Sequence, residues 1–495
     1  MDQAGTRILS PSSRARAALA ALLLILAGGD AASQTAGTAA SRYSVINLGP
    51  TTFGRALLNE NGQAAFDGGL FNVHTFFDGD QLHEVGSLGG GYTSMLALNN
   101  RGALVGNSLD AGQPHGDIRA FIWTLAGGMR ALPGPANANA WAINDRNQVA
   151  GKIDTQYNYS LRAVRWESDG RLVPLGPDSA PRSEAFVIND AGVVGGYTEA
   201  ADGRFHATLW GGSSKLIDLG PVNGDITSVS FLNERGEAAG VAYDAANNLH
   251  RSFFWSPRGG LVTIRTDRAG YSPLAAMNDR GEVAGITYNG DRSAAYVWSR
   301  ARGLAFLPRN GAAQTEVAAI NNHTQIAGAT RSASGAPRAA LWDGVSNPVD
   351  LTSRLIRPPA GLLLYTALAI NDAGVILANS NAGMVMLRPG MRGTDAPVLG
   401  PVTGLPESVA VGQEVRLRLS FVDNAPGQYH SASVDWGDRC PSPHPLVRES
   451  QGVGTIMLQH RFCAAGTYFP TIRVADSGGR ATTAYQMVTV NAPPD

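Results

Sequence analysis

The chain has 495 residues, 44% of them hydrophobic, and a formal net charge of −1 at pH 7. This charge balance excludes bulk electrostatic attraction to nucleic acid or to an anionic membrane surface, so no nucleic-acid partner is expected. Sixty glycines and the lack of long helical periodicity favour tight turns and β-structure over a helical fold.

Residues 1–33 have the organisation of a secretory signal peptide. Arg7, Arg14 and Arg16 precede the apolar run AALAALLLILAGG, and the small residues of DAASQT follow it. Spanning a bilayer takes about 20 apolar residues, so this run is too short for a membrane anchor. We therefore expect cleavage, export to the periplasm or the extracellular space, and no membrane span in the mature protein.

A ten-residue motif built on asparagine recurs through the middle of the chain. Consecutive motif asparagines lie 40 to 50 residues apart, and each follows an aliphatic residue. Gly stands three positions later in six of the eight copies, and seven positions later in a different set of six. Asn-x-x-Gly between two apolar runs predicts a tight turn, because Asn bonds the backbone and Gly takes a positive φ. We interpret these residues as turn formers rather than ligands: Asn59, Asn99, Asn144, Asn189, Asn233, Asn278, Asn321 and Asn371.

A second motif, which ends in an aromatic residue, follows the first seven of the eight turns. Examples are RAVRW at Trp166 and HATLW at Trp210, and Phe77 takes the aromatic place in the first unit. We interpret it as a third strand, and short runs such as LVPLG at 172–176 as a fourth. Four antiparallel strands in 40–45 residues are typical of a β-propeller blade.

The two ends of the repeat region complement each other. YSVINLG at 43–49 resembles an isolated fourth strand, whereas the last unit, from Asn371 to about Arg388, has only three strands. Pairing the two would close the ring and remove exposed sheet edges. The sequence therefore predicts an all-β fold with an eight-bladed β-propeller over 42–390. Seven blades are the alternative if one end unit is unpaired.

The repeat units resemble the HAF repeats of exported bacterial proteins. The strings HATLW at 206–210 and INDAGVVGGY at 188–197 are close to that pattern, and the resemblance extends over about 350 residues. It implies an extracellular or periplasmic setting. It implies no particular activity, because that family is defined by its repeat.

After a Pro/Gly-rich linker at 391–397, the segment 398–492 consists of alternating apolar runs separated by turns, which predicts a small β-sandwich. It resembles a PKD domain, an immunoglobulin-like module that serves as a spacer or as a carbohydrate- or protein-contacting accessory. The residues that carry this resemblance are Trp436, Gly437, Asp438, His460, Phe462, Gly466, Thr467, Tyr468, Val474 and Asp476.

The chain has two cysteines, Cys440 and Cys463. In an exported protein this pair predicts one disulfide. On the chain-entropy model such a bond would stabilise the C-terminal module by roughly 3 kcal/mol. Two cysteines without suitably spaced histidines are too few for a structural zinc site, so no metal is expected.

The sequence contains no catalytic motif that stands out. HExxH, GxSxG and a phosphate-binding glycine loop after a strand do not occur, so we assign no catalytic residue and no cofactor. Gly89–Gly91 is interpreted as a turn between blades, and His206 as a surface residue. Any carboxylate pair for glycoside chemistry would have to come from different blades.

Candidate binding residues come from loops that vary between repeats. In a four-stranded meander these loops lie at the end opposite the Asn turns, and variable loops on a rigid scaffold commonly carry binding. Aromatic, acidic and amide groups there suit sugar or peptide surfaces. The alternative is that the tyrosines only cover loop backbone. The candidates are Tyr92, His115, Tyr157, Tyr159, Tyr243, Asp244, Tyr271 and Tyr288.

Three functional hypotheses follow. The first is an exported, non-enzymatic binding protein that presents the loop face to a carbohydrate or protein ligand, such as a glycan, a peptide or an envelope component. The second is a polysaccharide lyase or glycoside hydrolase, for which carboxylates, or Tyr with His and Arg, should converge at the channel mouth. The third is a structural surface protein, for which exposed apolar patches on the rim are expected.

Overall fold

The structure is a computed structural model, and it describes residues 42–492 with short internal gaps. The gaps are 69–73, 112–116, 155–160, 177–181, 212–215, 223, 247–248, 267–271, 290–291, 334, 357, 359–360, 390–395, 407–408, 424–428, 451 and 478. The predicted signal peptide and most of the predicted linker lie outside the described residues.

Strands make up nearly all of the regular structure in this part of the chain, as the sequence predicts. The helix found among the described residues is one 3₁₀ turn, η1 (Leu351–Arg354). No helix in the described ranges has the length and apolarity needed to cross a membrane.

The repeat region consists of four-stranded antiparallel meanders in which neighbouring strands pair in chain order. The first three meanders are β2 (Thr51–Leu58), β3 (Ala64–Gly68), β4 (His74–Phe77), β5 (Leu82–Glu84); β6 (Gly89–Leu98), β7 (Leu104–Asp110), β8 (Ile118–Thr124), β9 (Gly128–Ala131); β10 (Asn139–Ile143), β11 (Val149–Asp154), β12 (Leu161–Trp166), β13 (Leu172–Pro174).

The next two meanders are joined into one eight-stranded sheet by a parallel bridge between Phe205 and Ile226. They and the two that follow are β14 (Ser183–Ile188), β15 (Val194–Glu199), β16 (Phe205–Trp210), β17 (Leu216–Asp218); β18 (Ile226–Leu232), β19 (Ala238–Asp244), β20 (Leu249–Ser256), β21 (Gly260–Ile264); β22 (Leu274–Met277), β23 (Glu282–Asn289), β24 (Arg292–Ser299), β25 (Gly303–Phe306); β26 (Gln314–Ile320), β27 (Gln325–Arg331), β28 (Arg338–Asp343), β29 (Val349–Asp350).

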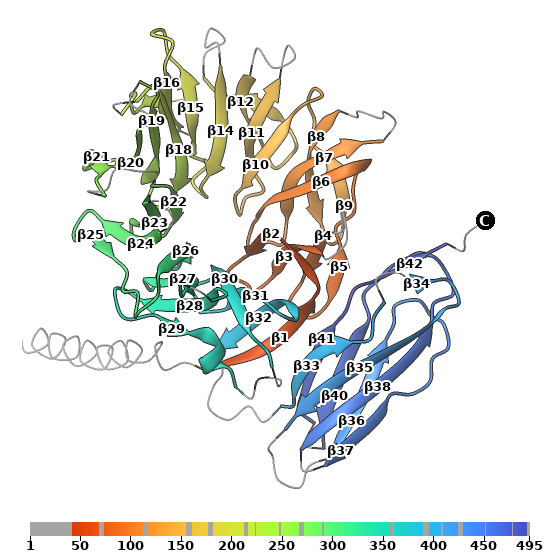
Figure 1. Cartoon of the computed structure of the whole chain (residues 1–495). Coiled ribbons are helices and arrows are strands. Elements are labelled where there is room, and N and C mark those ends of the chain that lie inside the picture. The colour runs from red at the N-terminus through yellow and green to blue at the C-terminus, as the bar shows by residue number, and fades with distance from the viewer. Residues whose placement is uncertain are drawn as a thin grey trace, which may run out of the picture. The chain divides into compact units, whose positions relative to one another are not determined.

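The last meander is completed by the first strand of the region, as expected. β30 (Leu364–Ile370), β31 (Ile376–Ser380) and β32 (Gly383–Pro389) are joined by β1 (Tyr43–Gly49), which pairs antiparallel with β32. In Figure 1 the orange-red β1 lies beside the cyan β32, and the meanders follow one another around a common centre. First strands such as β14 and β18 face this centre, whereas fourth strands such as β21 and β25 lie at the periphery. The arrangement is propeller-like.

The Asn-x-x-Gly motifs form the predicted turns. In the turn at Asn278, for example, the Gly281 N–H donates to the Asn278 carbonyl oxygen at 3.1 Å, and Gly281 has a φ of +75°. The Asn278 Oδ1 accepts the backbone N–H groups of Arg280 at 3.1 Å and Glu282 at 2.9 Å. Where Gly is missing, Asn147 and Thr324 adopt the same positive φ, at 59° and 61°.

The glycine seven residues after Asn has a separate role that the turn does not explain. It lies in the second strand of its meander, and a side chain there would collide with the carbonyl oxygen of the first strand. At Gly196 the obstructing carbonyl belongs to Glu184, and at Gly240 it belongs to Ser228. In both meanders the first strand has a register shift at this level, which indicates a β-bulge that brings its backbone close.

In every meander except the last, the third strand carries an aromatic residue that packs between neighbouring meanders. Trp166 is fully buried among residues of β7 and β8 in the preceding meander, such as Val105 and Ile122. Its indole N–H donates to the Pro133 carbonyl oxygen at 2.6 Å, and Trp342 makes the equivalent bond to Pro308 at 3.0 Å. The repeat period thus reflects contact between one sheet and the next.

One sequence-based interpretation is wrong. Gly89–Gly91 does not form a turn between units but begins strand β6, in which Gly89 pairs with Asp110. The reason for glycine at this place is close approach of the backbone, because a Cβ on Gly90 would collide with Leu109.

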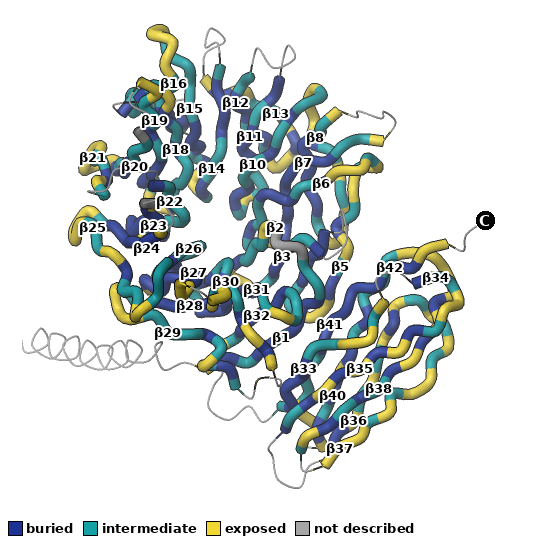
Figure 2. Tube along the Cα trace, in the orientation of Figure 1, coloured by how far each residue is buried: buried dark blue, intermediate teal, exposed yellow. Residues whose placement is uncertain are grey.

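The C-terminal segment forms three small sheets with the orders β33-β35-β38-β37, β34-β42-β39 and β36-β40-β41. One shared core includes Leu417, Trp436, Ile456 and Val474. Strand β35 alternates strictly between buried and non-buried residues, an alternation that Figure 2 shows by colour. The strands are β33 (Val398–Thr403), β34 (Val409–Ala410), β35 (Glu414–Val422), β36 (His430–Asp435), β37 (Leu446–Ser450), β38 (Val453–Arg461), β39 (Gly466–Tyr468), β40 (Thr471–Asp476), β41 (Ala481–Tyr485) and β42 (Val488–Asn491).

Candidate functional site

Four of the eight predicted binding residues are described, and all four lie at the strand ends opposite the Asn turns. Tyr92 is in β6, Tyr243 and Asp244 end β19, and Tyr288 is near the end of β23. Tyr92 and Tyr288 are 47% and 38% exposed, and the Tyr243 ring contacts the His250 ring at 4.6 Å. All four stand in strands rather than in the expected loops. The other four, His115, Tyr157, Tyr159 and Tyr271, lie outside the described residues.

A different group of residues has the properties of a site at the same strand ends. Its centre is Glu184, which is the second residue of the inner strand β14 and whose side chain is only 9% exposed. Glu184 Oε1 accepts the Trp141 indole N–H at 2.9 Å and lies 3.2 Å from Lys152 Nζ. Glu184 Oε2 accepts the Tyr197 hydroxyl at 3.2 Å. A nearly buried carboxylate is therefore held by three donors from β10, β11 and β15.

A chain of aromatic rings extends from this carboxylate, and with Glu184 and Lys152 these rings make up what we call the Glu184 cluster. Trp141 meets Phe186 edge-on at 6.1 Å, Phe186 lies 5.8 Å from Tyr197, and Tyr197 meets Phe205 at 5.1 Å. All four rings are partly exposed. Such edge-on pairs add to burial in fixing ring orientation.

Local backbone geometry places the two innermost rings. The pairing of β10 with β11 shifts register between Ala140 and Ala142, and that of β14 with β15 shifts between Ala185 and Val187. Trp141 and Phe186 are therefore the bulged residues of adjacent inner strands, and bulges commonly redirect a side chain. Burial first, and then the Glu184 carboxylate, raise the pKa of the Tyr197 phenol well above its ordinary value. Tyr197 is thus a hydrogen-bond donor at neutral pH.

Sequence reasoning missed the Glu184 cluster, although two signals marked it. Lys152 is one of only two lysines in the chain. Trp141 is the one tryptophan of the repeat region that does not lie in a third strand. Both residues depart from the repeat, whereas the predicted tyrosines were chosen by loop composition.

The opposite strand ends are closed by two rings of hydrogen bonds. In the first, the side-chain N–H of each turn asparagine donates to the carbonyl oxygen of the next turn asparagine at 2.9–3.2 Å, and Asn371 completes the circle to Asn59. The motif therefore forms each turn and also connects it to its neighbour. These asparagines are buried.

The second ring, which we call the acidic ring, uses the residue after each asparagine. Each backbone N–H donates to the side chain of the next member at 2.7–3.1 Å. Burial and neighbouring carboxylates raise the pKa values of Glu60 and Glu234. The side chain of every member already accepts a backbone hydrogen bond. We therefore interpret the acidic ring as a structural link between neighbouring meanders. The members are Glu60, Asn100, Asp145, Asp190, Glu234, Asp279, Asn322 and Asp372.

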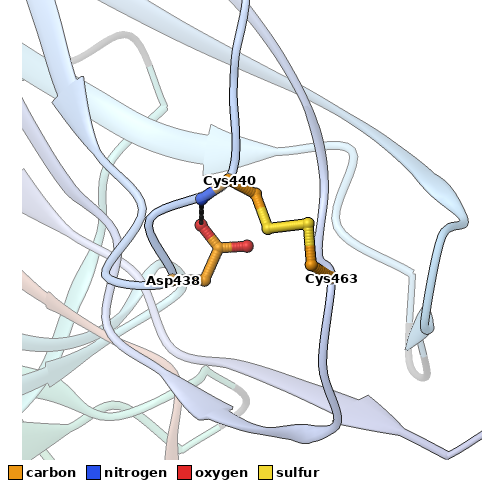
Figure 3. Close-up of side chains that lie close together, drawn as sticks. All are labelled: Asp438, Cys440 and Cys463. Atoms are coloured by element: carbon orange, nitrogen blue, oxygen red, sulfur yellow. Dashed lines mark hydrogen bonds between the residues drawn. A yellow bond between two sulfur atoms is a disulfide. The ribbon is translucent and has the colours of Figure 1, made fainter.

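The predicted disulfide between Cys440 and Cys463 is confirmed, with 6.2 Å between the Cα atoms. Figure 3 shows Asp438 beside it, with its carboxylate accepting the Cys440 backbone N–H at 3.1 Å. Among the described residues, these three are the one group of acidic, histidine or cysteine side chains close enough together for a shared metal ion. Because both sulfurs are in the disulfide, the group offers no thiolate ligand.

Comparisons with known proteins do not identify the chain. The sequence matches no protein-family model, and no curated protein matches it. Among solved structures, the Dos1 propeller shares 12% identity over 71% of this chain and 96% of its own, with a TM-score of 0.45. TolB from Acinetobacter baumannii shares 12% identity over 59% of this chain and 80% of its own, with a TM-score of 0.28. A puromycin hydrolase shares 12% over 75% and 62%, with a TM-score of 0.38.

At these identities and TM-scores the likenesses assign no function. The propeller-like description rests instead on the sheets and on the closed ring of turns. Because no family model matches, the resemblances to HAF repeats and to a PKD domain stay predictions.

Proposed function

We propose that this chain is an exported, non-enzymatic binding protein whose repeat region holds a saccharide at the Glu184 cluster. The observation that carries the proposal is the partly exposed Trp141 ring, whose indole N–H is fixed by a nearly buried carboxylate. Ligand sites combine aromatic surface with a few well-placed polar groups. Lys152 and Tyr197 supply such groups, and a ring held in place before binding loses little conformational freedom.

The wider architecture in this proposal is an eight-bladed propeller with a PKD-like spacer. Eight blades rather than seven are supported by the eight turns in the closed asparagine ring. Export is supported by the signal-like N-terminal sequence and by the disulfide, a bond that persists in oxidising compartments. The C-terminal module would then act as a spacer or a second contact.

Binding is favoured over catalysis by the chemistry of the cluster. Glycoside hydrolysis generally uses two carboxylates, and the Glu184 cluster contains one. A tyrosine acting as a base would need a lowered pKa, whereas burial and Glu184 raise the pKa of Tyr197.

A second candidate, self-assembly through the rim, is favoured by one observation. Leu216 in β17, Leu261 in β21 and Phe306 in β25 are 37%, 37% and 39% exposed on the outer strands of three successive meanders. Apolar groups repeated along a rim can mark an interaction surface. Sedimentation of the mature protein over a range of concentrations tests this: a monomer throughout counts against assembly.

A glycan array tests the main proposal, using the mature protein, Trp141→Ala and Tyr429→Ala. Tyr429 is a matched aromatic control because it is 71% exposed in the C-terminal segment. We expect saccharide binding by the wild type and the control, and at least about tenfold weaker binding by Trp141→Ala. A wild type that binds no glycan, or a Trp141→Ala variant that binds like the wild type, would contradict the proposal.

A further inference from the structure

A cavity of about 250 Å³ lies at the Asn-turn ends of the strands, away from the Glu184 cluster. It is lined from two adjacent meanders, β18–β21 and β22–β25. Arg235 and Glu237 come from the turn that follows β18, Arg280 from the turn that follows β22, and Glu282 from the start of β23. The turn between β24 and β25 adds Arg300 and Arg302. The lining thus holds four guanidinium groups and two carboxylates, a formal excess of two positive charges.

Both carboxylates in the lining are already engaged and nearly buried. Glu237 accepts the Asn233 side-chain N–H at 2.9 Å and pairs with Arg235 at 3.0 Å. Glu282 accepts the Asn278 side-chain N–H at 2.8 Å and the Thr324 hydroxyl at 2.7 Å, and it lies 3.9 Å from Arg302. These contacts leave the glutamates little capacity to neutralise the other arginines.

The remaining two arginines contact carbonyl oxygens and a ring rather than a described carboxylate. Arg280 donates to the Asn322 carbonyl oxygen at 3.5 Å. Arg300 donates to the Gly260 carbonyl oxygen at 2.6 Å and lies over the Phe254 ring at 5.7 Å. Both contacts preserve the full positive charge and orient the guanidinium planes.

Two members of the acidic ring, Glu234 and Asp279, are close in sequence to this cavity and add negative charge nearby. Their carboxylates are directed around the ring. Glu234 accepts the Asp190 N–H, and Asp279 accepts the Glu234 N–H at 2.8 Å and the Asn322 side-chain N–H at 3.1 Å. Neither carboxylate lines the cavity.

We propose that this cavity binds a small ligand through an oxyanion, a carboxylate, sulfate or phosphate group, held by Arg280, Arg300 and Arg302. Guanidinium groups match the geometry of such anions and make strong charge-assisted hydrogen bonds. The site shares no residue with the Glu184 cluster and does not depend on the saccharide proposal.

Calorimetric titration of the mature protein at low ionic strength tests this site. The probes are sodium glucuronate, sodium sulfate and sodium phosphate, with neutral glucose for comparison. The variants are Arg280→Gln, Arg302→Gln and the double change. The control is Arg258→Gln, an exposed arginine in the turn between β20 and β21 that does not line the cavity.

We expect at least one oxyanion to bind, glucose not to compete for this site, and added NaCl to weaken binding. The oxyanion affinity of the double variant should be lower than that of the wild type by about tenfold or more. Arg258→Gln should bind with wild-type affinity. Both substituted arginines are exposed, and an unchanged thermal transition would establish that the variants fold. The proposal is overturned if no oxyanion binds or if the double variant retains wild-type affinity. The preferred probe identifies which oxyanion the site selects.

Discussion

The two ends of the strands in the repeat region follow opposite rules. At the Asn-turn end, every repeat unit makes the same bonds to the next, and even the two units without Gly reproduce the turn with Asn147 and Thr324. At the other end, the Glu184 cluster occurs once, from residues that differ between units. The repeated residues of this sequence therefore build the ring of meanders. Residues that depart from the repeat indicate where one meander differs chemically from the others.

The largest effect should come from the backbone contact within each meander. Gly240→Ala places a methyl group against the Ser228 carbonyl oxygen and the Phe253 ring. We expect the free energy of unfolding to fall by about 3 kcal/mol or more. Gly236→Ala is the control in the same unit: it has open space around it but a φ of +71°, so the cost should be about 1 kcal/mol. The two variants are compared by their urea unfolding midpoints. Equal midpoints would contradict the claim that a Cβ at position 240 collides with the first strand.

Breaking the turn ring should have the next largest effect. Asn278→Ala removes two acceptor contacts within its turn and the donor bond to Asn321. Because these groups are buried, we expect a loss of about 2–3 kcal/mol in the free energy of unfolding. Asn61→Ala, an exposed residue with one bond to Asn100, should cost less than about 1 kcal/mol. If both variants unfold at the same urea concentration, the ring contributes no more than a surface contact.

A change at the Glu184 cluster should be smaller. Glu184→Gln keeps the size of the side chain but removes the charge opposite Lys152 and weakens the bond from Trp141. We expect a loss of about 1–2 kcal/mol, measured by thermal or urea unfolding. Glu316, five residues before Asn321, occupies the same repeat position, and Glu316→Gln should be close to neutral. Equal losses in both variants would mean that this position matters for the repeat rather than for the cluster.

The smallest effect should be a pH dependence in the acidic ring. Burial and the adjacent aspartates raise the folded-state pKa of Glu234. A carboxyl group with a raised folded-state pKa lowers stability as the pH rises past its unfolded pKa, because the folded state holds its proton more tightly. Glu234→Gln should therefore raise the urea midpoint at pH 7, and this gain should disappear towards pH 4. If Glu234→Gln raised the urea midpoint by the same amount at both pH values, the raised folded-state pKa of Glu234 would be contradicted.

The sequence predicts the repeating part of this structure well and the singular part poorly. Asn-x-x-Gly spacing is a local signal, so the turns and the pairing of β1 with β32 follow from it. The bonds between turns depend on donors about 45 residues apart, and no single unit reveals them. The sequence motif includes Gly196 but does not explain it. A glycine is required there because the bulge in the facing strand leaves no room for a side chain.

Site prediction was limited by its reliance on loop composition. Tyr92 and Tyr288 lie at the expected strand ends, but the contacts of Glu184 join three strands from two meanders and appear only in three dimensions. Lys152 and Trp141 were visible as departures from the repeat. Treating every such departure as a candidate would have identified the cluster.

The most direct test of the contrast between the two ends is saccharide binding by Trp141→Ala and Glu234→Gln, measured side by side with the wild type by calorimetry. We predict that the change at the loop end abolishes or strongly weakens binding, while the change in the acidic ring leaves the affinity unaltered. Equal loss in both variants, or loss only in Glu234→Gln, would contradict the view that function lies where the repeat is broken.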